Sequence, residues 1–199
     1  MLDKVLINKL ASKNRKFEKL FNQIGIIDIA PRNLDFASMV KIIINQQLSN
    51  KVAEIIYKRL HSLSVKVRPE NILDLGDEEL RKIGISYSKI KFIKDLAIAF
   101  LKNPNLIQSW RQLDDASALI EIQKLNGFGK WSANIILLFY LQRDDIFPDN
   151  DSTLNRAYEK IYGKKLSKNL EEIEWAKPNR SLLARYLWKW VDKGMKDLS

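Results

Sequence analysis

Two short segments contain residues whose types and spacing could do chemistry. The first is Leu125-Asn126-Gly127-Phe128-Gly129-Lys130-Trp131, which lies between two apolar-periodic stretches. Glycines this close together indicate a backbone that adopts positive φ or approaches another group closely. A helix beginning at Lys130 would point unpaired N–H groups out of its first turn, where anions bind. The segment predicts a phosphate-binding turn of Gly127, Gly129 and Lys130, although a plain interhelical turn would need the same glycines.

The second segment, Phe147-Pro148-Asp149-Asn150-Asp151, places two carboxylates in one loop ahead of a helix. One helix start needs only one capping side chain, so Asp151 has either a capping role or a catalytic one. A fixed carboxylate stabilises the positive charge that develops at C1′ when a glycosidic bond breaks, and it can orient or deprotonate the attacking water. We expect Asp151 to be this group and to lie open in a groove beside indole rings.

A nucleotide base that is flipped out of a duplex needs flat apolar walls. Trp131 and Trp188 are the candidates for such a base pocket, and a place in the core is the alternative for each of them. A tryptophan beside a cationic, alkylated purine gains a cation–π attraction of about 1–2 kcal/mol once water is excluded. Four other aromatic residues are less favoured as walls: Tyr140, Trp175, Tyr186 and Trp190.

The composition limits the classes of protein and partner. The 199 residues carry a net charge of +10, which favours a polyanion such as DNA as the partner. The absence of cysteine excludes disulfides and a cysteine-ligated iron–sulfur cluster, and His61, the single histidine, excludes histidine metal clusters and triads. The sequence has no apolar run long enough for a membrane span and no secretory signal pattern, so we expect no membrane partner.

Apolar residues recur at helical spacing, and no alternating strand pattern is present, so the sequence predicts an all-α fold. The strongest expected helices are residues 34–48, capped by Asn33, 51–63, capped by Ser49, and 86–101. Further helices are expected at 2–24 (two), 78–83 after Asp77, 117–124, 130–141, 152–162, 171–175 and 181–191. Lys89, Lys91 and Lys94 lie off the apolar stripe of their helix, which predicts a solvated face.

Together these motifs resemble the helix-hairpin-helix DNA glycosylases, in the branch of 3-methyladenine DNA glycosylase II. Leu125 to Asn134 is similar to the family's hairpin, and Asp151 stands where the family has its catalytic aspartate. Ile44-Asn45-Gln46-Gln47-Leu48-Ser49 is similar to the loop that faces the lesion, and Trp175 to Ser181 is similar to a C-terminal signature. The resemblance covers residues from about 34 to 190.

The resemblance implies a two-lobed helical bundle with a helix-hairpin-helix motif, an interlobe cleft and a single domain over residues 1–199. It implies that Gln47 or Leu48 is a wedge that fills the gap left by the flipped base. It also implies that the backbone of Gly127 and Gly129 grips a phosphate together with a structural monovalent or divalent cation. We expect no other cofactor, and a monomer that binds double-stranded DNA containing damaged bases.

Departures from the family pattern narrow the expected activity. Bifunctional relatives have a nucleophilic lysine where this chain has Trp131, which implies a monofunctional enzyme that uses water. The expected function is hydrolysis of the N-glycosidic bond of alkylated purines, such as 3-methyladenine, in base excision repair. Two alternatives stay open: a glycosylase for oxidised or deaminated purines, and a non-catalytic DNA-binding protein. The expected location is the cytoplasm, with the nucleoid, in a prokaryote and the nucleus in a eukaryote.

Overall fold

The computed structural model describes residues 4–64, 66–167 and 169–198. Throughout these residues the regular structure is helical and no strand occurs, which confirms the predicted all-α class. The chain divides into two compact units, which we call the terminal unit (Met1–Arg32 and Leu137–Ser199) and the central unit (Asn33–Ile136). In the described part of the chain, no helix is long and apolar enough to cross a membrane.

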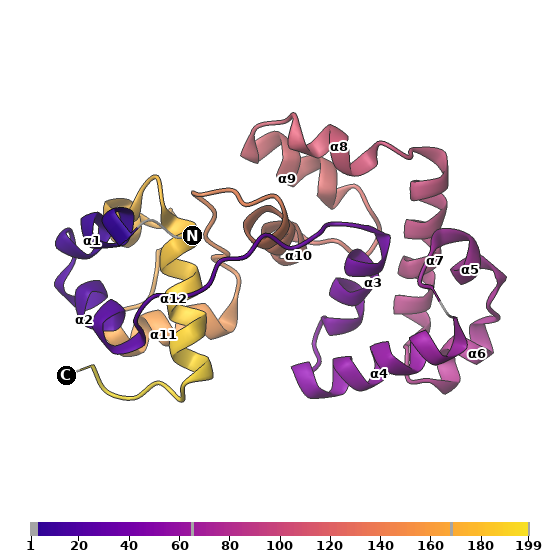
Figure 1. The fold of residues 1–199 in the computed structure, drawn as a ribbon, viewed down its shortest axis with the longest axis horizontal. Coiled ribbons are helices and arrows are strands. Elements are labelled where there is room, and N and C mark those ends of the chain that lie inside the picture. Colours follow the sequence, from indigo (N-terminus) through magenta and orange to yellow (C-terminus); the bar gives the residue numbers. More distant parts are fainter. Residues whose placement is uncertain (1–3, 65, 168, 199) are drawn as a thin grey trace. The chain divides into compact units, whose positions relative to one another are not determined.

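In the terminal unit, helices from the two ends of the chain pack together, so that indigo α2 lies beside yellow α12 (Figure 1). Its elements are α1 (Lys4–Ser12), α2 (Arg15–Ile24), the π-helix η1 (Ile136–Tyr140), which starts at the last residue of the central unit, α11 (Ser152–Tyr162), the 3₁₀-helix η2 (Glu171–Ala176) and α12 (Arg180–Asp192). Phe17 of α2 meets Tyr186 of α12 edge to face, with ring centroids 5.3 Å apart, and both rings are buried. This contact between distant segments is part of the core against which α11 packs.

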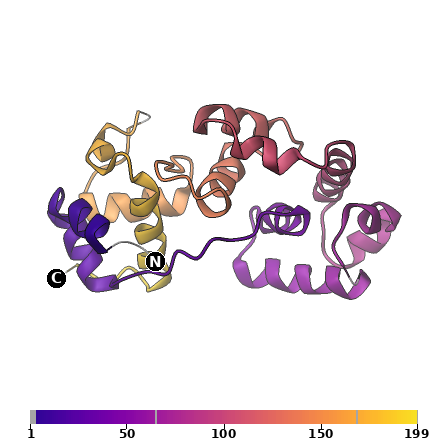
Figure 2. The same cartoon turned by 45° about the horizontal axis from the view of Figure 1, so that its top comes forward.

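The central unit is organised around its longest helix, α7, whose buried face consists of Ile90, Ile93, Leu96 and Ala97. Helices α3, α5 and α6 pack on α7, and α9 packs on α10, as the two views of the ribbon show (Figures 1 and 2). The elements are α3 (Phe36–Asn45), α4 (Asn50–Leu63), α5 (Pro69–Asp74), α6 (Asp77–Lys82), α7 (Tyr87–Lys102), α8 (Leu106–Arg111), α9 (Asp115–Gln123) and α10 (Lys130–Ile135).

Most helix ends follow the predicted local signals, and two caps do not. Ser49 caps α4 as expected, and Ser86, predicted as the first residue of its helix, is the N-cap of α7. The cap of α3 is Asp35 and not Asn33, because Asp35 forms a reciprocal capping box with Ser38. Helix α6 starts at Asp77 itself, since the side chain of Glu79 reaches back to the N–H of Gly76, which is the N-cap residue.

The helix predicted over residues 130–141 is wrong in its second half. Regular α-helix ends at Ile135, and Ile136–Tyr140 form a π-helix. Such wide turns are uncommon and often occur near functional sites. Apolar periodicity does not reveal the change, because all five residues of the π-helix are apolar or aromatic and no charged residue marks a face.

Candidate functional site

The predicted site residues divide between the two units. The hairpin residues and the wedge candidates lie in the central unit, whereas Asp151 and Trp188 lie in the terminal unit. Each group is built by contacts within its own unit.

The two glycines of the hairpin differ in backbone conformation and in the space around them. Gly127 has a φ of +85°, and a Cβ at this position would lie 2.6 Å from Cγ of Phe92, so positive φ and close approach both apply. Gly129 has a φ of −83° and is the N-cap residue of α10, and a Cβ there would meet no atom within 4 Å. Gly127 therefore serves the packing of the turn, while the backbone at Gly129 is open to an incoming group.

A side chain from the α3–α4 corner, which comprises Gln46–Ser49, holds the hairpin in place. Gln46 donates its amide Nε2 to the carbonyl oxygen of Gly127 at 2.7 Å and to Oγ of Ser132 at 3.0 Å. The structure gives the two adjacent glutamines different environments. Gln46 faces the hairpin, and Gln47 is exposed.

The wedge candidates lie at the outer side of this corner. Gln47 adopts a left-handed backbone conformation with a φ of 57°, which costs about 1–2 kcal/mol for a residue with a side chain. Leu48 is 38% exposed, a high value for an apolar side chain beside a buried helix. Both side chains are presented outward, as a wedge requires, and the structure does not choose between them.

The prediction of a solvated face on α7 is wrong for Lys89. Its ammonium donates to the carbonyl oxygens of Ile44 and Gln46, both at 2.8 Å, and so satisfies the end of α3. Partial burial lowers the pKa of Lys89. Lys91 and Lys94 agree better with the prediction, since they pair with Asp95 and Asp77 near the surface.

Helix α10 begins directly after the hairpin. Lys130 is exposed and Trp131 is half-buried, whereas Ser132, Ala133 and Asn134 are buried. The predicted phosphate-side charge and the predicted base wall therefore both lie at the accessible start of this helix, and the following residues fix it to the unit.

The structural cation implied by the family resemblance at the backbone of Gly127 and Gly129 stays a prediction. The carbonyl oxygen of Gly127 accepts an amide N–H of Gln46 at 2.7 Å, which uses one of its two lone pairs. In the described residues, no group of three or more histidine, cysteine, aspartate or glutamate side chains could hold a metal ion.

In the terminal unit, Asp151 is the N-cap of α11. Its Oδ1 accepts the N–H of Leu154 at 2.8 Å, and the residue is only 8% exposed. The expectation that this carboxylate lies open in a groove is therefore wrong. Capping fixes the orientation of the carboxylate, and the start of an 11-residue helix favours a negative charge there.

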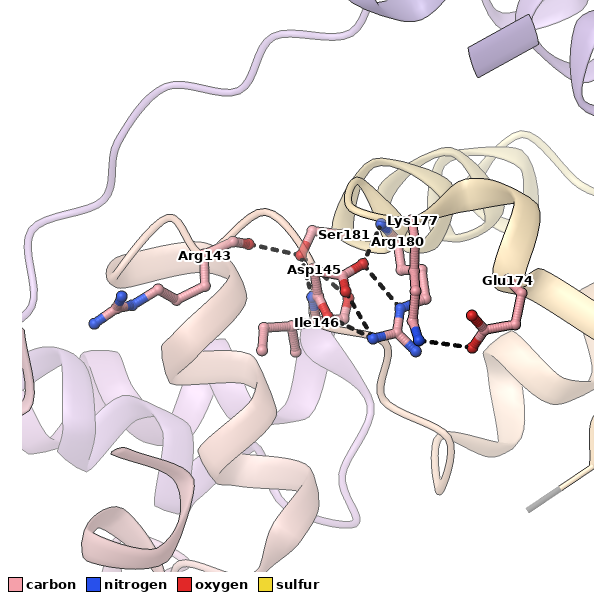
Figure 3. A network of polar contacts seen from close by, with 7 residues as sticks. All are labelled: Arg143, Asp145, Ile146, Glu174, Lys177, Arg180 and Ser181. Atoms are coloured by element: carbon pink, nitrogen blue, oxygen red, sulfur yellow. Dashed lines mark hydrogen bonds and ion pairs between the residues drawn. The ribbon is translucent and has the colours of Figure 1, made fainter. Parts of the chain in front are cut away.

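A polar network fixes the loop that leads to Asp151 (Figure 3). Arg180 forms a bidentate pair with Asp145, with Nε and Nη2 each 2.8 Å from a carboxylate oxygen. Ser181 accepts the N–H of Ile146 at 2.9 Å and donates to the carbonyl oxygen of Arg143 at 2.6 Å. The C-terminal signature noted in the sequence thus positions the loop, a role that its sequence did not reveal.

Trp188 is half-buried and packs against Phe139 of η1, with ring centroids 5.3 Å apart. The guanidinium groups of Arg32 and Arg185 each lie 4.6 Å from the same Phe139 ring. Burial and the neighbouring Arg32 lower the pKa of Arg185 to about 10. Trp188 therefore belongs to an aromatic and cationic cluster. By contrast, Tyr186 and Trp190 are buried in the core, whereas Tyr140 and Trp175 are half-buried.

One cavity of the terminal unit, of about 220 Å³, lies apart from these predicted residues. Neither Asp151 nor Trp188 lines it. Its walls come from α1, the segment before Arg32, the loop after η1 and the start of α12: Leu6, Ile29, Gln142, Arg143, Asp144, Asn179, Ser181, Leu182 and Arg185.

The all-helical fold, the glycine hairpin and the capped aspartate are features by which this chain can be compared with known protein families. Residues 40–191 match the family model of the HhH-GPD superfamily base excision DNA repair proteins. The match covers most of the chain, so this protein belongs to the HhH-GPD superfamily.

Named relatives carry the comparison further. The chain is 29% identical to DNA-3-methyladenine glycosylase 1 of Schizosaccharomyces pombe, over 77% of this chain and 71% of the relative. It is 28% identical to the DNA-3-methyladenine glycosylase of Saccharomyces cerevisiae, over 90% of this chain and 64% of the relative. Its fold is similar to the structure of the S. pombe 3-methyladenine DNA glycosylase in complex with abasic DNA, with a TM-score of 0.82, 25% identity and coverage of 95% and 97% of the two chains.

Proposed function

We propose that this protein is a monofunctional DNA glycosylase that hydrolyses the N-glycosidic bond of alkylated purines, such as 3-methyladenine, in double-stranded DNA. Membership of a base excision repair superfamily and relatives named 3-methyladenine glycosylases support this activity. The observation that carries the catalytic assignment is the position of Asp151, which stands where the resembled family has its catalytic aspartate in a chain of this superfamily; the N–H of Leu154 holds its carboxylate in one orientation.

Asp151 acts on the sugar and not on the base. As the C1′–N bond lengthens, positive charge develops on the deoxyribose ring, and an oriented carboxylate stabilises this charge more than it stabilises the neutral sugar of the ground state. The same group can orient or deprotonate the water that attacks C1′. An alkylated purine with a positive charge leaves as a neutral base, so a strong general acid is unnecessary.

The base is flipped out of the duplex before this reaction. Trp131 of the central unit and Trp188 of the terminal unit are each proposed to contact the base, and Gln47 or Leu48 is the proposed wedge. Gly127, Gly129 and Lys130 form the proposed phosphate contact, in which the open backbone of Gly129 approaches the DNA most closely. The net charge of +10 adds a salt-dependent attraction to the duplex.

The reaction uses water and not an enzyme amine. Trp131 stands where bifunctional relatives of the sequence family carry a lysine, and it cannot form a Schiff base. Borohydride treatment during turnover should therefore trap no protein–DNA adduct, and the product should be an intact strand with an abasic site.

Base release from methylated duplex DNA by wild type and by Asp151→Asn tests the proposal. Asparagine keeps the cap and removes the charge, so the variant should fold while its rate falls by about a hundredfold or more. Asp114→Asn is the matched control, because Asp114 caps α9 in the same way, through the N–H of Ser117. It should retain the wild-type rate. Equal release by wild type and Asp151→Asn would falsify the catalytic assignment.

The same assay decides between the substrate classes. Release of oxidised or deaminated purines, without release of methylated ones, would replace the proposed substrate. DNA binding without release of any base from a defined lesion panel would identify a non-catalytic binding protein. In each case the partner is DNA, so we propose that the protein acts at the nucleoid in the cytoplasm of a prokaryote or in the nucleus of a eukaryote.

A further inference from the structure

Gln46 connects the two parts of the central unit that are proposed to touch DNA. Its amide lies 2.7 Å from the carbonyl oxygen of Gly127 and 3.0 Å from Oγ of Ser132, so it bonds both the turn of the hairpin and the helix that follows it. The next two residues along the chain, Gln47 and Leu48, are the exposed wedge candidates. Gln46, which makes these hydrogen bonds, directly precedes Gln47, whose backbone conformation is left-handed.

The corner is also fixed from its other side. Lys89 donates to the carbonyl oxygens of Ile44 and Gln46, while the N–H of Leu48 donates to the carbonyl oxygen of Asn45 at 3.2 Å. The carbonyl groups at the end of α3 therefore have partners even though the chain reverses here. A loop held by so many bonds moves as part of the body that carries it.

We propose that Gln46 is a positioning residue that makes the hairpin and the wedge corner a single rigid DNA-engaging element. This inference rests on the proposed function, because it assigns the hairpin to a phosphate and the corner to the lesion. When the hairpin seats on a phosphate, the amide of Gln46 fixes where Gln47 and Leu48 stand. Non-specific contact with the backbone is thereby coupled to entry of the wedge at the site where the base leaves.

The two hydrogen bonds of Gln46 require a side chain of this length that carries an N–H donor. Both contacts come from the same Nε2, which gives its two hydrogens to two oxygens. Glutamate has the same shape but cannot donate when ionised, and its oxygen would repel the carbonyl oxygen of Gly127. Methionine fills similar space and has no donor. The pair Gln46→Glu and Gln46→Met therefore separates loss of the bond from active repulsion.

The experiment measures binding and base unstacking separately. The probes are an undamaged duplex and a duplex with a stable abasic analogue beside a fluorescent adenine analogue. Wild type should prefer the abasic duplex and raise the fluorescence as the wedge enters. Gln46→Met and Gln46→Glu should fold with a lowered melting temperature, because two part-buried hydrogen bonds are lost, and should keep wild-type affinity for undamaged duplex when assayed well below that temperature. Both should lose the fluorescence rise, and their preference for the abasic duplex should fall by about tenfold or more.

Gln123→Glu is the matched control, because Gln123 donates its amide only locally, to the carbonyl oxygen of Leu119 on an exposed face of α9. It should behave as wild type. Ser132→Ala removes one of the two acceptors and should give an intermediate loss. A purely structural role would lower the affinity for both duplexes by the same factor, and that result overturns the proposal, as does a full fluorescence rise with Gln46→Met and Gln46→Glu.

Failure of the inference is distinguishable from failure of the proposed function. If wild type releases no methylated base but its wedge signal depends on Gln46, the glycosylase assignment fails and the coupling stands. If wild type releases base but shows no unstacking signal, the glycosylase assignment stands and the role of the corner is refuted.

Discussion

The ring of Phe92 occupies the space that a side chain at residue 127 would need. A Cβ on Gly127 would lie 2.6 Å from Cγ and Cδ2 of Phe92, and the φ of Gly127 is +85°. Phe92 belongs to α7, the longest helix of the central unit. Because Gly127 has no side chain, the hairpin can pack directly against this helix. The turn is therefore a fixed part of the central unit.

We predict that Gly127→Ala lowers the free energy of unfolding by about 2–4 kcal/mol, because overpacking against Phe92 adds to the cost of positive φ. Chemical denaturation should detect the change. A double variant with Phe92→Leu should recover part of the loss, since the smaller side chain relieves the overlap. A fully stable Gly127→Ala would contradict the packing role.

We predict the opposite pattern for Gly129→Ala. Its φ is −83° and no heavy atom lies within 4 Å of the added Cβ, so the stability should stay close to that of wild type. The methyl group would instead stand where a phosphate approaches the backbone, and affinity for duplex DNA should fall by about tenfold or more. Binding titrations at one fixed salt concentration measure this. Unchanged affinity would remove Gly129 from the interface.

Substitutions of Asp151 should separate capping from charge. Asp151→Ala removes the acceptor for the N–H of Leu154 and should cost about 1 kcal/mol of stability, while Asp151→Asn keeps the cap and should cost much less. Both should lose base release to a similar degree, because both lack the carboxylate. If Asp151→Asn is active and Asp151→Ala is not, the residue serves the helix alone.

The loop before Asp151 should depend on Arg180. Its pair with Asp145 is bidentate and partly buried, with 17% and 26% of the two side chains exposed. Arg180→Gln should therefore lower stability by about 1–3 kcal/mol and slow base release, because the loop loses its anchor. Lys177→Gln is the control, since its pair with Glu174 is exposed and contributes about 0–1 kcal/mol (Figure 3). Equal effects of the two changes would argue against the anchor.

Local signals in the sequence predicted the fold well. Side chains that cap a helix act on neighbouring N–H groups, so Ser49 was predicted as a cap, and Asp151 as a possible one, from a few adjacent residues. Glycines with positive φ are local signals of the same kind, and Gly25 and Gly163 end α2 and α11 in this way. These features need no knowledge of the rest of the chain.

Long-range partners explain what the sequence could not reveal. Lys89 looked like a surface charge because its acceptors, at Ile44 and Gln46, come from another helix. Arg180 and Ser181 were visible only as a signature, because their bonds to Asp145 and Ile146 cross 35 positions. Asp151 itself was recognised, but its burial follows from packing that no local pattern encodes.

Alkaline pH should weaken the terminal unit through its buried tyrosines. Burial raises the pKa of Tyr158 and that of Tyr186 from 10 to about 12 each. Because the folded-state pKa values lie above the unfolded ones, the unfolded chain loses protons first. The stability associated with both groups is therefore complete below pH 10 and is lost as the pH rises from 10 to 12.

Denaturant unfolding at increasing pH, followed together with tyrosinate absorbance, should show this loss. Tyr186→Phe should flatten the dependence, because phenylalanine keeps the ring contact with Phe17 and removes the ionisable group. It should also cost about 1 kcal/mol at neutral pH, since the hydroxyl donates to the carbonyl oxygen of Gly25 at 3.0 Å. Ionisation of both tyrosines near pH 10 while the protein stays folded would show that they are not buried in solution. The same result would contradict the packing of α11 against α12, which positions Asp151.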